Sequence, residues 1–196
     1  MRQLLPPFES ARKAIHLTGG LIPLLYLFLD LTKTQALLIL GGLALPFLLS
    51  DLLRLRLPHL NRWFLRCFAL AMRPGEENRT TGATYYLLAC WLTILLFDKS
   101  VAIPALLVLA CGDTAASVFG QALGGYKFRE GKTLTGSLAF LITAFLVTLP
   151  FFPTPIAFAG AFIAAVVESL PLPLDDNLSI PLTAGFAFTL FHPLPT

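Results

Sequence analysis

The chain has 196 residues, of which 56% are hydrophobic and only 13% are charged, and its mean hydropathy is +0.77. About a quarter of the residues in a soluble domain are charged, so this composition excludes an ordinary water-soluble globule. The formal net charge of +3 is too small to predict a nucleic-acid partner. The sequence therefore predicts an integral membrane protein surrounded by lipids.

Seven apolar runs follow one another along the chain, and each is a candidate transmembrane helix. About 20 residues cross the hydrocarbon core, and several of the runs are shorter, so some flanking polar residues must lie at membrane depth. Prolines within the runs are tolerated because neighbouring helices satisfy the backbone groups that proline leaves free. We expect an all-α, polytopic bundle of about seven transmembrane helices that forms one domain over residues 1–196. The runs are Thr18–Leu29, Gln35–Ser50, Ala83–Phe97, Val101–Gly120, Leu134–Phe152, Ile156–Leu170 and Leu178–Phe191.

Lysine and arginine are unevenly distributed among the connections between these runs. Twelve of the fourteen lie in the N-terminal segment, between the second and third runs, or between the fourth and fifth. The exceptions are Lys33 and Lys99. Because basic connections stay on the cytoplasmic side, we expect a cytoplasmic N-terminus and an external C-terminus. The expected location is the plasma membrane of a prokaryote.

The connection Leu53–Arg73 has a helical pattern of its own. Apolar side chains recur at helical spacing, with arginines between them. This pattern predicts an amphipathic helix on the cytoplasmic surface. The alternative is a cytoplasmic extension of the second run. The apolar positions are Trp63, Phe64, Cys67, Phe68 and Ala71, and the arginines are Arg62, Arg66 and Arg73.

The segment Cys111–Ser137 carries the sharpest candidate chemistry. On a helix, Asp113 would share one face with Ser117, Gly120 and Gly124. Small residues on that face allow another helix or a ligand to approach the backbone. A carboxylate at membrane depth is costly, which favours a functional role for Asp113, paired or metal-bound. The structural alternative is a salt bridge that joins two helices.

Glycine and lysine alternate in the second half of this segment. Glycines permit tight turns with exposed N–H groups that bind anions, and two lysines and two hydroxyls lie among them. We expect this phosphate loop to hold a polyphosphate, with a helix that begins near Thr135 directing its positive end toward it. A soluble P-loop is excluded, because five residues rather than four separate Gly125 from Gly131 and no strand precedes them. The candidate residues are Gly124, Gly125, Lys127, Gly131, Lys132, Thr133, Gly136 and Ser137.

A second polar segment precedes the seventh run, on the same predicted side. It holds Glu168, Asp175, Asp176 and Asn177. Carboxylate and amide oxygens beside a phosphate loop are ligands suited to Mg²⁺. The alternative is that Asp176 or Asn177 only caps the seventh helix.

Two further segments hold weaker candidates. Arg12, Lys13 and His16 precede the first run; a basic cluster that sets orientation explains the first two, but orientation does not require His16. Asn78 and Thr81 precede the third run, where Thr81 is alternatively a helix cap.

Taken together, these motifs resemble the CTP-dependent polyprenol kinase family, which includes dolichol kinase, phytol kinase and CTP-dependent diacylglycerol kinase. The resemblance covers about Arg12 to Pro181 and is carried by the basic N-terminal motif, the Gly112–Ser117 run, the phosphate loop and the segment from Glu168 to Asn177. The central segment is also distantly similar to phosphatidate cytidylyltransferases, but their C-terminal signature is not found.

The resemblance implies transfer of the γ-phosphate of CTP to a lipid hydroxyl, with Mg²⁺ as cofactor. On this hypothesis Lys127, Lys132, the loop glycines and Asn177 hold the nucleotide. Asp113 with Asp175 or Asp176 holds the metal, and Asp113 or Glu168 acts on the hydroxyl. Polyprenol, diacylglycerol and phytol-type alcohols all stay open as substrates.

Two other functions compete with this hypothesis. A cytidylyltransferase would use the same CTP and Mg²⁺ but attack the α-phosphate to form a CDP-lipid. A transporter would be expected to show inverted repeats with broken helices near the midplane. Here the polar groups gather at one face, which argues against a transporter.

Overall fold

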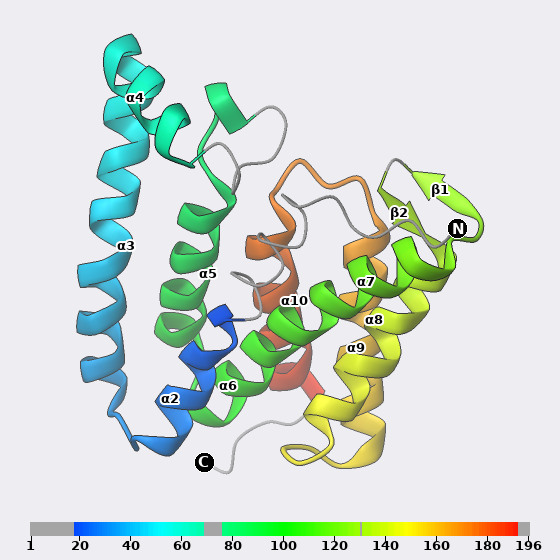
Figure 1. Ribbon diagram of the computed structural model, residues 1–196. Helices are drawn as coiled ribbons and strands as arrows, with labels where there is room; N and C mark the ends of the chain where they lie inside the picture. Colours follow the sequence, from blue (N-terminus) through cyan, green and yellow to red (C-terminus); the bar gives the residue numbers. More distant parts are fainter. Residues whose placement is uncertain (1–17, 69–75, 130, 192–196) are drawn as a thin grey trace.

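The computed structural model describes residues 18–68, 76–129 and 131–191, which form a helical bundle with one short hairpin (Figure 1). The prediction of a helical bundle is confirmed for these residues, and the hairpin is the departure from an all-α fold. In chain order the elements are α2 (Leu21–Phe28), α3 (Lys33–Arg56), α4 (Pro58–Phe68), the 3₁₀ turn η2 (Glu76–Asn78), α5 (Gly82–Leu96), α6 (Lys99–Leu107), the π-helical turn η3 (Val108–Gly112), α7 (Asp113–Leu123), β1 (Lys127–Arg129), β2 (Lys132–Thr133), α8 (Leu134–Thr148), α9 (Thr154–Ser169) and α10 (Asp176–Phe191).

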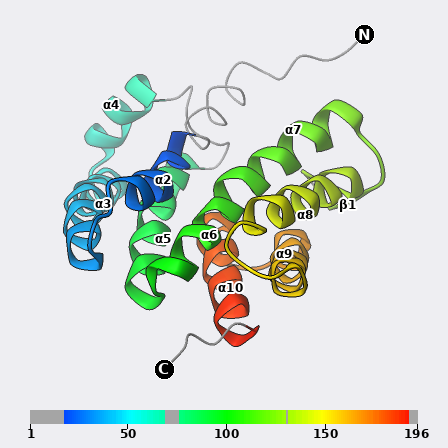
Figure 2. The same ribbon diagram turned by 90° about the horizontal axis from the view of Figure 1, so that it is seen from below.

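The continuous helix α6–η3–α7 lies at the centre of the bundle. In α6 every residue from Val101 to Leu106 is buried, and α2, α5, α8 and α10 all pack against it. The end-on view shows this helix crossing the molecule between the α3–α5 side and the α8–α9 side (Figure 2). Small side chains such as Ala102 and Ala105, both fully buried, let the neighbouring helices approach closely. This helix corresponds to the fourth apolar run, and its π-helical turn was not predicted.

The outer surface of α3 is apolar. Leu38 is 71% exposed and Leu45 is 56% exposed, although both are large hydrophobic side chains. Two helices, Lys33–Arg56 and Lys99–Leu123, are long and apolar enough to cross a bilayer, and α5, α8 and α9 are shorter apolar helices. An exposed apolar surface of this size indicates that lipid surrounds the bundle. The number of spans and the sides of the two termini stay predictions.

The helix α4 is separate from α3. The backbone at Leu57 is extended, with φ −118° and ψ 101°, and Pro58 begins the next helix. The residue before a proline avoids the α conformation, so the sequence itself places the break. The second apolar helix therefore does extend beyond Ser50, to Arg56, but a distinct amphipathic helix follows it. Residues 69–75 lie outside the described part of the chain.

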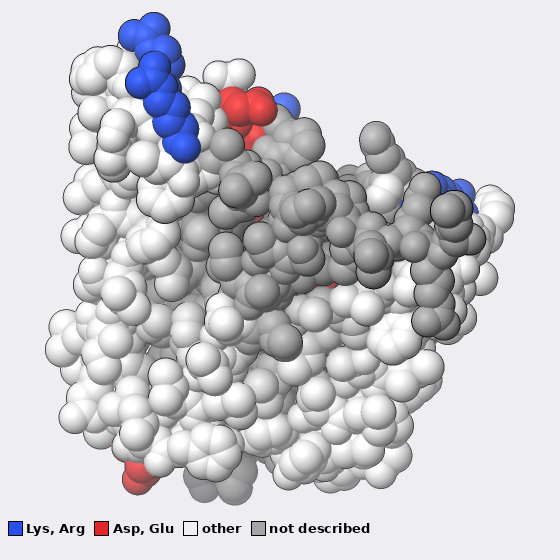
Figure 3. Space-filling view, in the orientation of Figure 1, with Lys and Arg blue, Asp and Glu red and all other residues white. Residues whose placement is uncertain are grey.

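Basic side chains gather at one end of the molecule. In Figure 3, lysine and arginine atoms cover α4 on one side of the upper end and the hairpin on the other. The site candidates from α8, α9 and α10 lie at this same end, where α10 begins (Figure 1). The structure thus places the predicted polar segments together at the basic end of the bundle.

Candidate active site

Lys132 lies between two carboxylates that come from different helices. Its Nζ atom donates to Glu168 Oε1 at 2.5 Å and to Asp176 Oδ2 at 2.9 Å. Lys132 is on β2, Glu168 is in the last turn of α9, and Asp176 is the first residue of α10. The side chain of Glu168 is 2% exposed, whereas those of Lys132 and Asp176 are 13% and 22% exposed. We call these three residues the Lys132 cluster.

Hydroxyl groups complete the hydrogen bonding of Glu168. Ser137, in the first turn of α8, donates to Glu168 Oε2 at 3.0 Å. The single hydroxyl proton of Ser169 has two acceptors within reach, Ser137 Oγ at 3.1 Å and the carbonyl oxygen of Ala165 at 2.9 Å. Both carboxylate oxygens of Glu168 are therefore bonded, one to an ammonium and one to a hydroxyl, which fixes the orientation of its side chain.

The charges of the Lys132 cluster do not balance. Burial opposes the charged form of Lys132, but the neighbouring carboxylates of Asp176 and Glu168 outweigh it and raise its pKa. One cation thus faces two anions across a partly exposed surface. The net negative charge suits a divalent cation brought in by a nucleotide.

The described residues offer few ligands for Mg²⁺, but a metal that is held mainly by a nucleotide needs few. Among the described residues no group of three or more His, Cys, Asp or Glu side chains could hold a metal ion. Mg²⁺ in nucleotide sites is bound by one or two carboxylates together with phosphates and water. Asp176 could supply such a carboxylate, so the residues fit a metal held mainly by its nucleotide.

The first turn of α10 is capped by Asp175. Its Oδ1 atom accepts from the backbone N–H of Asn177 at 2.9 Å, and its carbonyl oxygen accepts from Leu178 and Ser179. The sequence alone suggests Asp176 or Asn177 as the cap. The helix begins at Asp176, so the cap falls one residue earlier. The side chain of Asp176 is thereby left to reach Lys132.

Asn177 joins α10 to the start of α5. Its Nδ2 atom donates to the carbonyl oxygen of Gly82 at 3.2 Å, and the residue is 2% exposed. Within the described residues, its Oδ1 atom and the hydroxyl of Ser179 are buried without a hydrogen-bond partner. Buried polar atoms are nearly always paired, so Asn177 has an acceptor that a ligand could use.

The phosphate loop has the backbone that its glycines predict. Gly124, Gly125 and Gly131 have φ angles of 65°, 114° and 75°, a region that L-residues rarely adopt. The two strands pair Lys127 with Thr133. Lys127 is exposed on β1.

The start of α8 is already partly capped. Thr133 is the N-cap and accepts from the N–H of Gly136 at 3.1 Å, while the N–H of Leu134 donates to the carbonyl oxygen of Tyr126 at 3.0 Å. The side chain of Thr135 also donates to the carbonyl oxygen of Gly124. The helix begins at Leu134, one residue before the predicted start. Two first-turn N–H groups are therefore used within the chain rather than free for an anion.

Gly120 and Gly136 mark the closest approach of α7 and α8. A Cβ atom at Gly120 would lie 2.8 Å from the hydroxyl of Thr133, and one at Gly136 would lie 2.8 Å from the carbonyl oxygen of Ala116. The predicted small-residue face of α7 is thus confirmed at Gly120, where another helix approaches. This contact fixes the position of α8, and with it Ser137.

Asp113 comes from a different element than the three residues of the Lys132 cluster. It begins α7 and is partly buried, three residues before Ala116, whose carbonyl oxygen lies against Gly136 of α8. In the described part of the chain, the carboxylates that contact Lys132 are Glu168 and Asp176, and Asp113 is not among them. Ser117, one turn further on, accepts a long hydrogen bond from Gln121 at 3.5 Å. The proposed roles of Asp113 and Ser117 stay predictions.

The weaker candidates fall in different places. Arg12, Lys13 and His16 lie outside the described residues. Asn78 is exposed on η2. Thr81 is the N-cap of α5 and accepts from the N–H of Thr84, as the structural alternative predicted. It also belongs to a second cluster.

Asp51 and Arg54 form a buried ion pair that the sequence analysis did not single out. Each is 2% exposed, and Arg54 Nε donates to Asp51 Oδ1 at 2.6 Å. Asp51 Oδ2 accepts from the N–H of Thr81 at 2.8 Å, from its hydroxyl at 3.0 Å, and from the hydroxyl of Thr84 at 2.7 Å. The available signal was an acid and an arginine three residues apart at the end of an apolar helix, where charge is costly unless paired.

Arg54 holds the connection between α4 and α5. Its guanidinium donates to the side chain of Asn61 at 3.0 Å and to three carbonyl oxygens, those of Glu76, Glu77 and Arg79, at 3.2, 3.4 and 2.5 Å. The carboxylate of Glu76 accepts from the N–H of Gly82 at 3.1 Å. Since the carbonyl of Gly82 accepts from Asn177, this connection also touches the first turn of α10.

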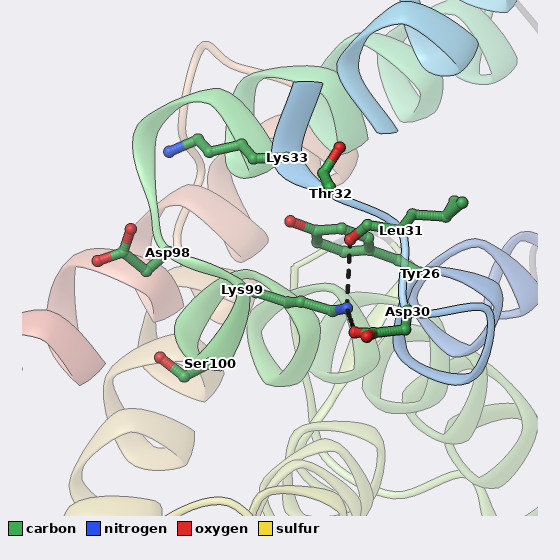
Figure 4. Close-up of a pocket in the computed structure, with 8 residues that line it drawn as sticks. All are labelled: Tyr26, Asp30, Leu31, Thr32, Lys33, Asp98, Lys99 and Ser100. Carbon is green, nitrogen blue, oxygen red and sulfur yellow. Dashed lines mark hydrogen bonds and ion pairs between the residues drawn. The ribbon is translucent and has the colours of Figure 1, made fainter. Parts of the chain in front are cut away.

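A pocket of about 680 Å³ lies at the other end of the bundle (Figure 4). Lys99 crosses it, donating to Asp30 Oδ1 at 2.8 Å and to the carbonyl oxygen of Leu31 at 3.2 Å, with its ammonium 5.0 Å from the centre of the Tyr26 ring. No candidate residue from the sequence analysis lines this pocket. The candidate chemistry therefore lies at the basic end.

Comparison with known proteins agrees with the resemblance. A CTP-dependent diacylglycerol kinase of Schizosaccharomyces pombe is 29% identical, over 90% of this chain and 90% of the relative. An uncharacterized protein of Methanocaldococcus jannaschii is 30% identical over 91% of each chain. A probable chloroplastic phytol kinase of Glycine max is 33% identical over 57% of this chain and 44% of its own length. The chain belongs to the CTP-dependent polyprenol kinase family.

Membership of the CTP-dependent polyprenol kinase family rests on similarity along nearly the whole chain rather than on a match to a family profile. No protein-family profile matches the chain, and no solved structure matches it. The alignments with the yeast-type and archaeal relatives span nearly the whole chain.

Proposed function

We propose that this chain is a CTP-dependent lipid kinase that transfers the γ-phosphate of CTP to the hydroxyl group of a membrane-embedded alcohol. The observation that carries the proposal is the Lys132 cluster, beside a glycine-rich loop at the basic end of the bundle. The names of the similar proteins support it: several are CTP-dependent diacylglycerol kinases and others are probable phytol kinases. The acceptor is a polyprenol, a phytol-type alcohol or diacylglycerol.

The membrane arrangement follows from the substrates. The whole chain acts as one kinase domain with about seven spans, a cytoplasmic N-terminus and an external C-terminus, in the plasma membrane of a prokaryote. The lipid alcohol reaches the site from the bilayer, while CTP arrives from the cytosol. The concentration of basic side chains at the end of the bundle that holds the Lys132 cluster supports a cytoplasmic site.

The loop residues hold the nucleotide. Gly124, Gly125 and Gly131 give the hairpin its shape, and Lys127 and Lys132 supply positive charge to the triphosphate. Asn177 offers its unpaired acceptor to the nucleotide. When bound, Mg²⁺ would neutralise charge on the β- and γ-phosphates. Its candidate ligands are Asp113 together with either Asp175 or Asp176.

The phosphoryl transfer requires positioning and charge neutralisation more than covalent chemistry. Glu168 orients the lipid hydroxyl and accepts its proton as the new oxygen–phosphorus bond forms at the γ-phosphate. The bond between the γ-phosphorus and the β–γ bridging oxygen breaks, and CDP leaves. Ser137 and Lys132 hold the two oxygens of Glu168 before this step, and Lys132 turns toward the phosphates when nucleotide enters. Asp113 is the alternative base.

The test is incubation of the purified protein with γ-labelled CTP or ATP, Mg²⁺ and a panel of lipid alcohols. The expected result is a labelled lipid with CTP as donor and CDP as the second product. Release of pyrophosphate with an unlabelled lipid product would instead identify the cytidylyltransferase alternative. The variant Asp113→Asn should lose turnover with its fold retained, and near wild-type activity would exclude Asp113 as metal ligand or base.

A further inference from the structure

The outer face of α4 is basic and aromatic, and its cations are unpaired. Arg62, Arg66 and, just before the helix, Arg56 are exposed, and none forms a hydrogen bond or ion pair with the described residues. Trp63, between them, is 61% exposed. In Figure 3, lysine and arginine atoms form a row over α4. The buried Arg54, which has five hydrogen bonds, contrasts with these three free cations.

The inner face of α4 is fixed to the bundle, which gives the outer face a defined direction. Arg54 donates to Asn61, and its guanidinium lies 4.8 Å from the centre of the Phe64 ring. Asn61 also donates to the carbonyl oxygen of Glu77 at 2.9 Å. The arginine row is therefore held on one side of a docked helix.

The position of α4 indicates what covers this face. The last turns of α3 are still apolar on the outside, with Leu52, Leu53 and Leu55 exposed by 46%, 51% and 38%. The basic helix begins after the break at Leu57, where this apolar surface ends. A tryptophan flanked by arginines at the edge of an apolar surface is typical of the membrane–water interface.

We propose that Arg56, Arg62, Trp63 and Arg66 form a binding surface for the headgroups of anionic phospholipids. The arginines pair with lipid phosphates, and the indole ring lies at the headgroup level. Strong polybasic recognition uses about four to eight cations, so three predict local enrichment of anionic lipid rather than one tightly bound molecule. The proposal concerns the surrounding bilayer and does not depend on the kinase activity.

The chain has only two tryptophans, Trp63 and Trp91, which permits a direct test. Trp91→Phe leaves Trp63 as the single fluorophore, and the protein is reconstituted in bilayers that contain brominated lipid, a contact quencher. Brominated phosphatidylglycerol should quench Trp63 about twofold or more above brominated phosphatidylcholine at the same mole fraction. In 1 M salt, where the Debye length falls to about 3 Å, this difference should disappear.

Charge variants separate the proposal from simple membrane proximity. Arg62→Gln with Arg66→Gln should remove the preference for the anionic lipid but keep quenching by the zwitterionic one. The control Lys33→Gln with Lys127→Gln removes two charges elsewhere and should keep the preference. Trp91→Phe removes a hydrogen bond, because Trp91 donates to the carbonyl oxygen of Leu37. As a check, the fluorescence of the Trp63→Phe variant is subtracted from that of the wild type, which gives the quenching of Trp63 with Trp91 intact. Equal quenching by both lipids overturns the proposal, and so does absence of quenching by either, which points to a protein on this face.

Discussion

Two clusters of charge lie at the same end of the bundle and differ in how fully their groups are used. In the Asp51–Arg54 pair one acid meets one base, both are 2% exposed, and each forms several further hydrogen bonds. In the Lys132 cluster one base is shared by two acids, and two of the three side chains reach solvent. The first arrangement is closed and balanced, whereas the second is open and carries excess negative charge.

This difference separates a structural role from a chemical one. A buried pair contributes little net stability, but removal of one partner leaves an uncompensated charge in the interior. An unbalanced and partly exposed cluster can exchange one partner for a ligand without that penalty, and perturbed groups of this kind gather at functional sites. The comparison leads us to expect loss of stability from changes in the first cluster and loss of activity from changes in the second.

The largest effect is expected for Arg54→Met. It leaves Asp51 buried without its cation and frees three backbone carbonyls, so the free energy of unfolding should fall by about 3–5 kcal/mol. Chemical unfolding in detergent micelles measures this change. Arg66→Met, on the exposed face of α4, is the matched control and should have little effect. A loss below about 1 kcal/mol for Arg54→Met, the size of an ordinary hydrogen bond, would contradict a closed pair.

Glu168→Gln should separate activity from stability. The amide cannot accept the proton of the lipid hydroxyl, so the rate should fall by at least about 100-fold, the lower range for loss of a general base. The amide oxygen can still accept from Lys132, and the amide NH2 group can donate to the hydroxyl of Ser137, so the unfolding midpoint should change little. Product formation from labelled CTP and thermal unfolding are measured on the same preparation. Unchanged activity would remove Glu168 from the mechanism.

Gly136→Ala tests whether the contact of α7 with α8 positions the open cluster. The added methyl group would meet the carbonyl oxygen of Ala116 at 2.8 Å, and overpacking of this kind costs about 1–3 kcal/mol. Activity should fall with stability, because Ser137 moves with α8. Gly42→Ala is the control: it has nothing within 4 Å and lies inside α3. There the added methyl should stabilise the helix by about 0.5–1 kcal/mol.

The smallest effect is expected from alkaline pH. The raised pKa of Lys132 means that its stabilising contribution is complete below the unfolded value, about 10.4 for lysine, and is lost as pH rises through the higher folded value. The unfolding midpoint should therefore lose nothing through Lys132 between pH 7 and 9. Lys132→Arg, which cannot deprotonate in this range, should show the same profile. If the unfolding midpoint of the wild type fell between pH 7 and 9 and that of Lys132→Arg did not, Lys132 would lose its proton in this range and its pKa would not be raised.

The bundle and the grouping of polar segments were predictable from local patterns. Apolar runs predict helices wherever they fold, and the one-sided distribution of basic residues predicted which ends lie together. On that basis Glu168 and Asp176 are expected on the same side as the phosphate loop, and in the structure both contact Lys132. Glycine also permits the positive φ angles found at Gly124, Gly125 and Gly131, although Gly120 and Gly136 of the same segment are helical.

Other features depend on tertiary contacts that no local pattern contains. The Asp51–Arg54 pair requires the α5 cap to approach α3, and from the sequence alone Arg54 is only one of the orienting charges. The short hairpin forms because Lys127 and Thr133 meet across a glycine turn, although neither strand is long enough to be read in the sequence. The cap at Asp175 rather than Asp176 depends on where α10 begins, and helix ends are the least certain element of a sequence-based prediction.

The π-helical turn at Val108–Gly112 has a consequence for how this chain tolerates change. A π turn holds an extra residue relative to an α-helix, so it sets the rotational phase between α6 and everything that follows. If the same residues formed a regular α-helix, Asp113 and Gly120 would turn by about 100°, the step of one α-helical residue. The side that meets α8 would then carry the wrong residues. Deletion of one residue within the turn would instead give a regular helix that keeps Asp113 and Gly120 in nearly their present directions, so the central helix should tolerate the loss of a residue there better than elsewhere along its length.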